Sequence, residues 1–171
     1  MRNLRNNKGI GLLALILIIV AILVIGGIIV GVVIINKNVN KEPMTAKEFT
    51  DIMEDKGFQI VDVKQQFSNY DYIEKAYVAL EEDGDYQIEF YKLAEEEDAI
   101  YFYNLNKDKF ESTKTSISTE LTKSIGNNSK YVLTSDGKYK VISRIEDTAI
   151  YLDVDEKYKD KIKQILKELG Y

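Results

Sequence analysis

The sequence contains no cysteine, no histidine and no tryptophan, and only one proline. Without cysteine the chain forms no disulfide, no thiolate metal site and no cysteine nucleophile. Without histidine it lacks the commonest general base and the commonest zinc ligand. The sequence therefore predicts a protein that is not an enzyme, and it predicts neither a cofactor nor a metal.

Acidic residues are almost missing from the beginning of the chain. Residues 1–43 hold five bases and one acid, whereas residues 44–171 hold 18 bases and 27 acids. An acidic domain argues against nucleic acid as a partner, because phosphate binding requires a basic face. Residues 44–171 suffice for one domain with a core and are too few for two ordinary domains.

Residues 10–35 form a long run with no charge and no proline. A helix over this run reaches roughly 39 Å, which exceeds a hydrocarbon core of ~30 Å. Three bases and no acid precede it, which favours a cytoplasmic N-terminus. We predict a cytoplasmic flank 1–9, a transmembrane helix 10–35, a linker 36–43 and an extracytoplasmic domain 44–171. The lipid bilayer is then the first expected partner.

Cleavage of this segment is the main alternative to an uncleaved anchor. A secretory signal has an apolar core of about 7–15 residues followed by a small-residue site. Here the apolar run is longer, and it ends at Val33–Asn36 without such a site. The sequence favours the uncleaved anchor.

A different cleavage site is suggested by Lys8-Gly9-Ile10, where a basic stretch ends in glycine and an apolar helix follows. This start resembles the leader of prepilin-like proteins. The resemblance implies cleavage after Gly9 and a membrane helix that packs into a filament. Ala14 stands where that family usually has glutamate. A pilin-like subunit is therefore the alternative function.

Gly27 and Gly31 match the small-xxx-small spacing that lets two membrane helices approach closely. They are the candidate contact for homo-association through the membrane helix. The competing interpretation is that glycine is simply frequent in such helices.

The outer domain has the pattern of an α+β fold, with antiparallel sheet backed by helices. Thr45 and Glu48 form a capping box that begins a helix. In residues 112–130, Ile117, Leu121 and Ile125 are spaced four apart, which predicts a helical middle. The expected order is α-β-β-β-α-β-β-β-α. Strands are expected at 58–63, 76–80, 86–93, 131–134, 138–144 and 148–153. One helix is expected to begin after Thr45, a second to begin at residue 95, and a third to span about 155–169.

Two stretches of this order resemble each other. Tyr77-Val78 followed by Asp83-Gly84-Asp85-Tyr86 has a counterpart in Tyr131-Val132 followed by Asp136-Gly137-Lys138-Tyr139. Asp-Gly is typical of hairpin turns in general, so chance and duplication both account for the match. Two related halves remain an open interpretation.

Candidate catalytic groups have structural alternatives. Ser135 and Lys138 fit a Ser-x-x-Lys spacing but straddle a predicted hairpin turn, which we favour. Carboxylates cluster at 81–85, 95–98 and 153–156, and none of the clusters fits a calcium loop. A hydrolase that uses carboxylates only is the remaining enzymatic alternative.

Phe67, Tyr70 and Tyr72 lie together in a predicted loop. An aromatic ring with a hydroxyl suits contact with a protein or a glycan, so these three are the candidate surface contact. As a whole, the chain resembles uncharacterised single-pass membrane proteins of low-GC Gram-positive bacteria, a resemblance that implies an anchor but no activity. We therefore predict a membrane-anchored extracytoplasmic domain that binds a protein or cell-envelope partner and is not an enzyme.

Overall fold

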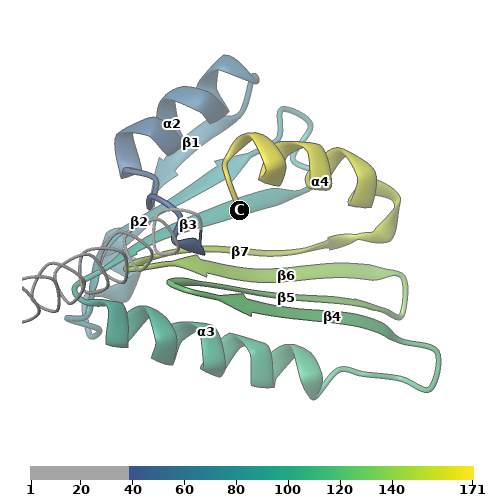
Figure 1. Cartoon of the computed structure of the whole chain (residues 1–171). Helices are drawn as coiled ribbons and strands as arrows, with labels where there is room; N and C mark the ends of the chain where they lie inside the picture. Colours follow the sequence, from purple (N-terminus) through teal and green to yellow (C-terminus); the bar gives the residue numbers. More distant parts are fainter. Residues whose placement is uncertain (1–38) are drawn as a thin grey trace, which may run out of the picture. The chain divides into compact units, whose positions relative to one another are not determined.

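The computed structural model describes residues 39–171 (Figure 1). The predicted membrane segment 10–35, with Gly27 and Gly31, and the predicted cleavage after Gly9 lie outside the described residues. Residues Asn40–Tyr171 form one compact unit. Within residues 39–171, no helix has the length and apolar character to cross a membrane.

Seven antiparallel strands form a single sheet in the order β1-β2-β3-β7-β6-β5-β4. Three α-helices and two short 3₁₀ helices accompany them. This confirms the predicted α+β class, with antiparallel sheet backed by helices. The elements are α2 (Ala46–Asp55), β1 (Gln59–Asp62), a 3₁₀ helix (Lys64–Phe67), β2 (Ile73–Leu80), β3 (Gln87–Leu93), α3 (Glu96–Glu111), β4 (Thr119–Ile125), β5 (Asn128–Ser135), β6 (Lys138–Ile145), β7 (Thr148–Asp155), a 3₁₀ helix (Glu156–Tyr158) and α4 (Lys159–Glu168).

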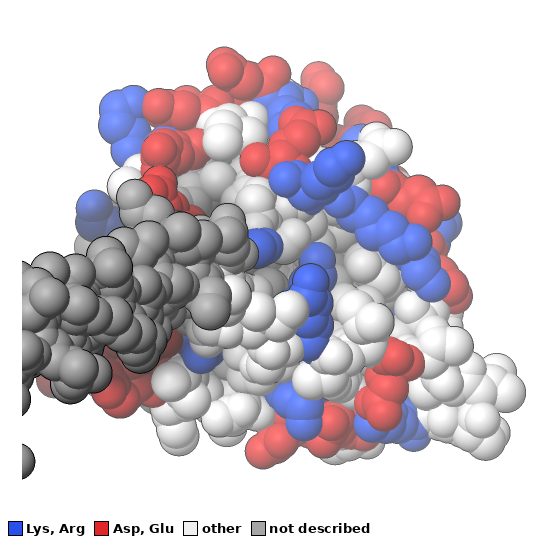
Figure 2. Space-filling view, viewed as in Figure 1, with Lys and Arg blue, Asp and Glu red and all other residues white. Residues whose placement is uncertain are grey.

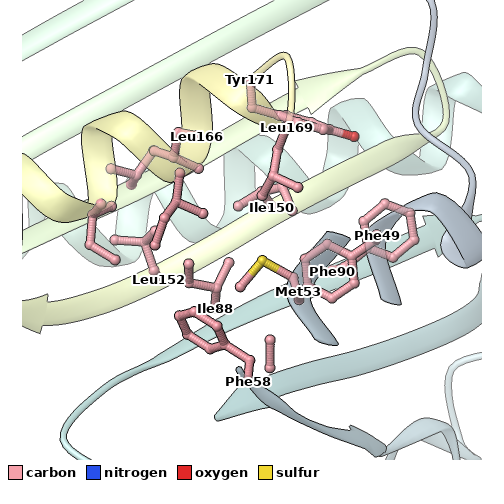
Figure 3. Close-up of a cluster of buried hydrophobic side chains, with 14 of the residues drawn as sticks. Phe49, Met53, Phe58, Ile88, Phe90, Ile150, Leu152, Leu166, Leu169 and Tyr171 are labelled. Atoms are coloured by element: carbon pink, nitrogen blue, oxygen red, sulfur yellow. The ribbon is translucent and has the colours of Figure 1, made fainter. Parts of the chain in front are cut away.

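Helices cover both faces of the sheet: α2 and α4 pack on one face and α3 packs on the other (Figure 1). On the α2–α4 face, Phe49 stacks on Phe90 with ring centroids 5.0 Å apart. Met53 lies between α2 and the sheet in the same cluster (Figure 3). Full burial of such side chains stabilises the fold by roughly 1.5–3 kcal/mol each. The two cores share one sheet, and every strand except the exposed β4 contributes side chains to both.

Local sequence signals explain several element boundaries. The Thr45 hydroxyl accepts a 3.2 Å hydrogen bond from the Glu48 amide, and the Glu48 carboxylate accepts one of 2.8 Å from the Thr45 amide. This confirms the predicted capping box. Gly84 and Gly137 have φ of +73° and +69°, which an Asp-Gly hairpin turn requires. Both predicted hairpins are therefore present.

The helix predicted within residues 112–130 is wrong. Thr119–Ile125 is a seventh strand, β4, and it pairs with β5 along its whole length. A spacing of four residues fits one face of a helix, but it also fits one face of a strand, where alternate residues share a side. The β-branched residues Thr119, Thr122 and Ile125 favour the strand here. The observed order is therefore α-β-β-β-α-β-β-β-β-α.

The two stretches that resemble each other in sequence are not equivalent in the sheet. The β2–β3 connection spans residues 81–86, whereas Asp136 and Gly137 alone connect β5 to β6. Tyr77 packs on the α2–α4 face and Tyr131 on the α3 face. Because one register step moves a side chain to the opposite face, these hairpins do not support a duplication.

Candidate functional site

The predicted contact residues Phe67, Tyr70 and Tyr72 form one aromatic cluster. The ring centroids of Phe67 and Tyr70 are 6.4 Å apart, and those of Tyr70 and Tyr72 are 5.8 Å apart. Consecutive turns hold this loop: the Tyr70 amide donates to the Phe67 carbonyl at 3.0 Å, and the Ile73 amide to the Tyr70 carbonyl at 3.1 Å. The loop is thus a compact platform.

The cluster continues onto α3 and β3 through further ring contacts. Phe67 meets Tyr91 edge-on at 5.6 Å, and Tyr91 meets Phe102 at 4.6 Å. At the other end, Tyr72 meets Tyr101 at 6.1 Å and 90°. Aromatic pairs at such separations and tilts stabilise one another beyond the area they bury. Six rings from three separate segments therefore form one continuous aromatic chain.

A pocket of about 350 Å³ lies within this aromatic chain. We call it the aromatic pocket. Its volume is at the lower end of the range of ligand pockets, roughly 300–1,000 Å³. Its lining comes from three places: Phe67, Tyr70, Tyr72 and Ile73 from the loop and the start of β2; Phe102, Leu105, Asn106 and Lys109 from α3; and Glu89, Tyr91 and Tyr151 from β3 and β7.

Polar groups of β3 are fixed within the strand. The Tyr91 hydroxyl donates a 2.5 Å hydrogen bond to Glu89 Oε2, and Gln87 Nε2 donates one of 2.7 Å to Glu89 Oε1. Burial, followed by the nearby Glu89 carboxylate, raises the pKa of Tyr91. Burial, Glu89 and Asp153 raise the pKa of Tyr151 to about 12. Both phenols are therefore neutral near pH 7 and remain hydrogen-bond donors.

The rim of the aromatic pocket is exposed to solvent. Tyr70 is 49% exposed, Tyr101 57% and Leu105 37%. Single exposed apolar side chains are common on protein surfaces, but here Tyr70 and Leu105 line one pocket and Tyr101 contacts Tyr72 of its lining. Large flat side chains with hydroxyl groups at a rim are typical of binding surfaces. The pocket is thus arranged for contact with an apolar or aromatic group.

The catalytic alternatives weighed from sequence have structural roles. Ser135 and Lys138 are partners across the β5–β6 turn. The Ser135 hydroxyl donates to the Thr113 carbonyl at 3.0 Å, and Lys138 pairs with Asp155 at 2.6 Å. The two side chains therefore bind other groups. Within residues 39–171, no three acidic side chains are arranged to hold a metal ion.

Sequence reasoning found one side of the pocket and missed the others. No local sequence signal indicates that Phe102 of α3 contacts Tyr91 of β3. Tyr151 lies far along the chain from Phe67, and the β3–β7 pairing brings the strands of Tyr91 and Tyr151 together. No short-range signal predicts a pairing of this kind.

Comparison of the chain with protein-family models, with curated proteins and with solved structures finds no match.

Proposed function

We propose that the protein is a membrane-anchored, extracytoplasmic and non-enzymatic binding domain, whose ligand site is the aromatic pocket. The single observation that carries the proposal is the ring chain from Tyr101 through Tyr72, Tyr70 and Phe67 to Tyr91. The anchor is the apolar run 10–35, and the basic flank before it favours a cytoplasmic N-terminus. The bilayer and a protein or envelope component are the proposed partners.

The ligand that fits the pocket best is a protein segment with an apolar or aromatic side chain beside a basic one. The apolar side chain enters between Tyr70 and Leu105. A basic neighbour suits the surroundings, because Asp71 follows Tyr70 and Asp98 acts electrostatically on Tyr72. Tyrosine faces also attract cations directly. Residues 44–171 as a whole hold 18 bases and 27 acids, which favours a basic partner further.

The lining of the pocket supports binding rather than catalysis. Glu89 is the one carboxylate among the described residues that line it, and hydrogen bonds from Tyr91 and Gln87 engage both of its oxygens. A hydrolase that uses carboxylates needs two such groups facing the same substrate.

Binding of envelope material by residues 40–171 tests the proposal. We expect the double variant Tyr70→Ala/Tyr101→Ala to lose at least about tenfold in affinity, because aromatic rim residues dominate such contacts. The matched control is Tyr70→Phe/Tyr101→Phe, which keeps both exposed aromatic rings and removes only their hydroxyl groups. Equal binding by both double variants would refute the proposed site.

A further inference from the structure

A second surface, on the opposite face of the sheet, gathers lysines in this acidic domain. It surrounds a hollow of about 320 Å³ between α4 and the β4–β5 hairpin. Lys130 of β5 lines the hollow with Lys159 and Lys163 of α4, and Lys123 of β4 lies directly opposite Lys130. Lys41 lies close enough to Lys130 to act on it electrostatically. We call Lys41, Lys123, Lys130, Lys159 and Lys163 the basic face.

The positive charge of the basic face is only partly compensated. Lys159 pairs with Glu156 at 3.4 Å and Lys163 with Asp160 at 3.2 Å, whereas among residues 39–171 no Asp or Glu side chain pairs with Lys41, Lys123 or Lys130. Lys41 Nζ donates to the Gly170 carbonyl oxygen at 2.5 Å, and Lys130 Nζ donates to a backbone oxygen of Tyr171 at 3.3 Å. Burial, then Lys41 and Lys123, lower the pKa of Lys130. Glu120 borders the hollow, but its carboxylate bonds to Lys114 and to the Tyr131 hydroxyl. Figure 2 shows blue atoms across the surface between α4 and β4, with red atoms toward the margins.

Exposed apolar side chains adjoin the lysines. Ile117 is 86% exposed, Leu121 58% and Ile125 43%. Leu121 and Ile125 share one face of β4 with Lys123, because alternate strand residues point to the same side. Lysines beside exposed aliphatic groups are typical of surfaces that lie in a lipid headgroup region, where the ammonium groups contact phosphates and the aliphatic groups enter the acyl boundary.

The chain enters the domain at this same place. The Lys41 amide donates to Asn127 Oδ1 at 2.9 Å, and Asn127 Nδ2 donates to the Lys41 carbonyl at 2.7 Å. Asn127 lies in the β4–β5 turn. Residues 36–39 separate Asn40 from the predicted end of the anchor at Ile35. At about 3.5 Å per residue, a segment of this length reaches at most roughly 18 Å, so the tether between the predicted anchor and Asn40 is short.

We propose that the basic face, together with Ile117, Leu121 and Ile125, docks onto the anionic lipid surface of the membrane that holds the anchor. This inference rests on the anchor in the proposed function. Weak docking suffices, because a short tether converts it into an intramolecular event with a high effective concentration. Docking in this orientation leaves the aromatic pocket, on the opposite face of the sheet, open to a partner.

Full-length protein in lipid nanodiscs provides the direct test. The chain has no native cysteine, so a single introduced cysteine is the one thiol available for labelling. A fluorophore at Leu121→Cys should be quenched by spin-labelled lipid when the disc contains phosphatidylglycerol, and less so in phosphatidylcholine alone. The matched site is Asn104→Cys, which is exposed on α3 and should show little quenching. Equal quenching at the two sites overturns the proposal. Quenching at Leu121→Cys that is the same with and without phosphatidylglycerol also overturns it.

Sedimentation of residues 40–171 with phosphatidylglycerol vesicles separates this inference from the anchor. Each lysine near an anionic surface contributes a factor of roughly five in binding. We therefore expect Lys123→Glu/Lys163→Glu to reduce vesicle binding at least about tenfold. The control Lys47→Glu/Lys75→Glu has the same charge change at exposed positions elsewhere and should reduce it much less.

Two further outcomes are decisive. If inorganic phosphate binds at Lys130 while the vesicles do not bind, the face is a pocket for a soluble anion and the proposal fails. If the full chain does not enter nanodiscs, the anchor in the proposed function is wrong, and vesicle binding by residues 40–171 still decides the docking surface on its own.

Discussion

The side chain of Asn127 holds the backbone of Lys41 at both its amide and its carbonyl, at 2.9 Å and 2.7 Å. The Asn127 amide in turn donates to Asn40 Oδ1 at 3.2 Å. A residue in a β-turn thereby fixes the first residues of the domain, far from it in sequence. The same residue also bonds to Glu146.

We expect Asn127→Ala to destabilise the domain by about 1 kcal/mol, because it leaves the part-buried amide and carbonyl of Lys41 without their partner. Hydrogen exchange at the Lys41 amide should accelerate, while exchange in β6 changes little. Asn104→Ala, at an exposed position on α3, is the control. Unchanged exchange at Lys41 would contradict the assigned role of Asn127.

Two buried tyrosine hydroxyls should respond oppositely to replacement by phenylalanine. The Tyr103 hydroxyl is buried and has no hydrogen-bond partner among the described residues. The Tyr171 hydroxyl forms a 2.5 Å hydrogen bond with the Thr148 hydroxyl. We expect Tyr103→Phe to be neutral or to stabilise by up to about 1 kcal/mol, and Tyr171→Phe to cost about 1 kcal/mol. Urea unfolding measures both, and a loss of stability in Tyr103→Phe would show that its hydroxyl has a partner.

The stacked pair Phe49 and Phe90 is fully buried between α2 and the sheet. We expect Phe90→Ala to cost about 3–5 kcal/mol in unfolding free energy, because it removes apolar contacts and leaves a cavity. Ile117→Ala, at a side chain that is 86% exposed, should stay within about 0.5 kcal/mol of wild type. Comparable losses in the two variants would mean that the core is placed incorrectly.

Stability should fall in alkaline solution partly through Tyr151. Its pKa is raised from an ordinary value of 10.0 to about 12 in the folded state. As the pH rises above 10, the unfolded chain loses this phenol proton first, so unfolding becomes more favourable. The contribution of Tyr151 is complete below pH 10 and is lost as the pH approaches 12. Urea unfolding across this range should show a shallower decline for Tyr151→Phe, with Tyr101→Phe as the control for loss of one phenol.

Residues 40–171 should unfold in one cooperative step, because the two cores lie on opposite faces of one sheet and both draw side chains from β1, β2, β3, β5, β6 and β7. Circular dichroism follows the sheet and helices, and tyrosine fluorescence follows the side chains on both faces. Their transitions should coincide in urea. Two separate transitions would show that the faces are independent units and would weaken experiments that use this fragment.

Short-range signals predicted the parts of the fold that depend on neighbouring residues. The capping box at Thr45 and the Asp-Gly turns at Gly84 and Gly137 involve few residues and one backbone geometry each. The helix expected around Leu121 failed because a spacing of four serves both helix and strand, and pairing with β5 decided the outcome. Local patterns cannot supply that pairing.

The candidate site was predictable in part for the same reason. Phe67, Tyr70 and Tyr72 are close in sequence, so their clustering needed only a compact loop. The rest of the aromatic pocket depends on α3 packing over β3, and on the pairing of β3 with β7. The pairing joins Tyr91 to residues about sixty positions later, a distance at which sequence periodicity carries no information.

The pairing of β3 with β7 also bears on how the chain folds as it is made. Strand β3 is complete at Leu93, but its second neighbour begins only at Thr148. Until β7 has been synthesised, β3 is an unpaired edge strand of the β1–β2–β3 meander, although it lies at the centre of the finished sheet. Much of the apolar surface of the meander is then also uncovered. We therefore expect chains that end before β7 to aggregate more readily than the complete domain.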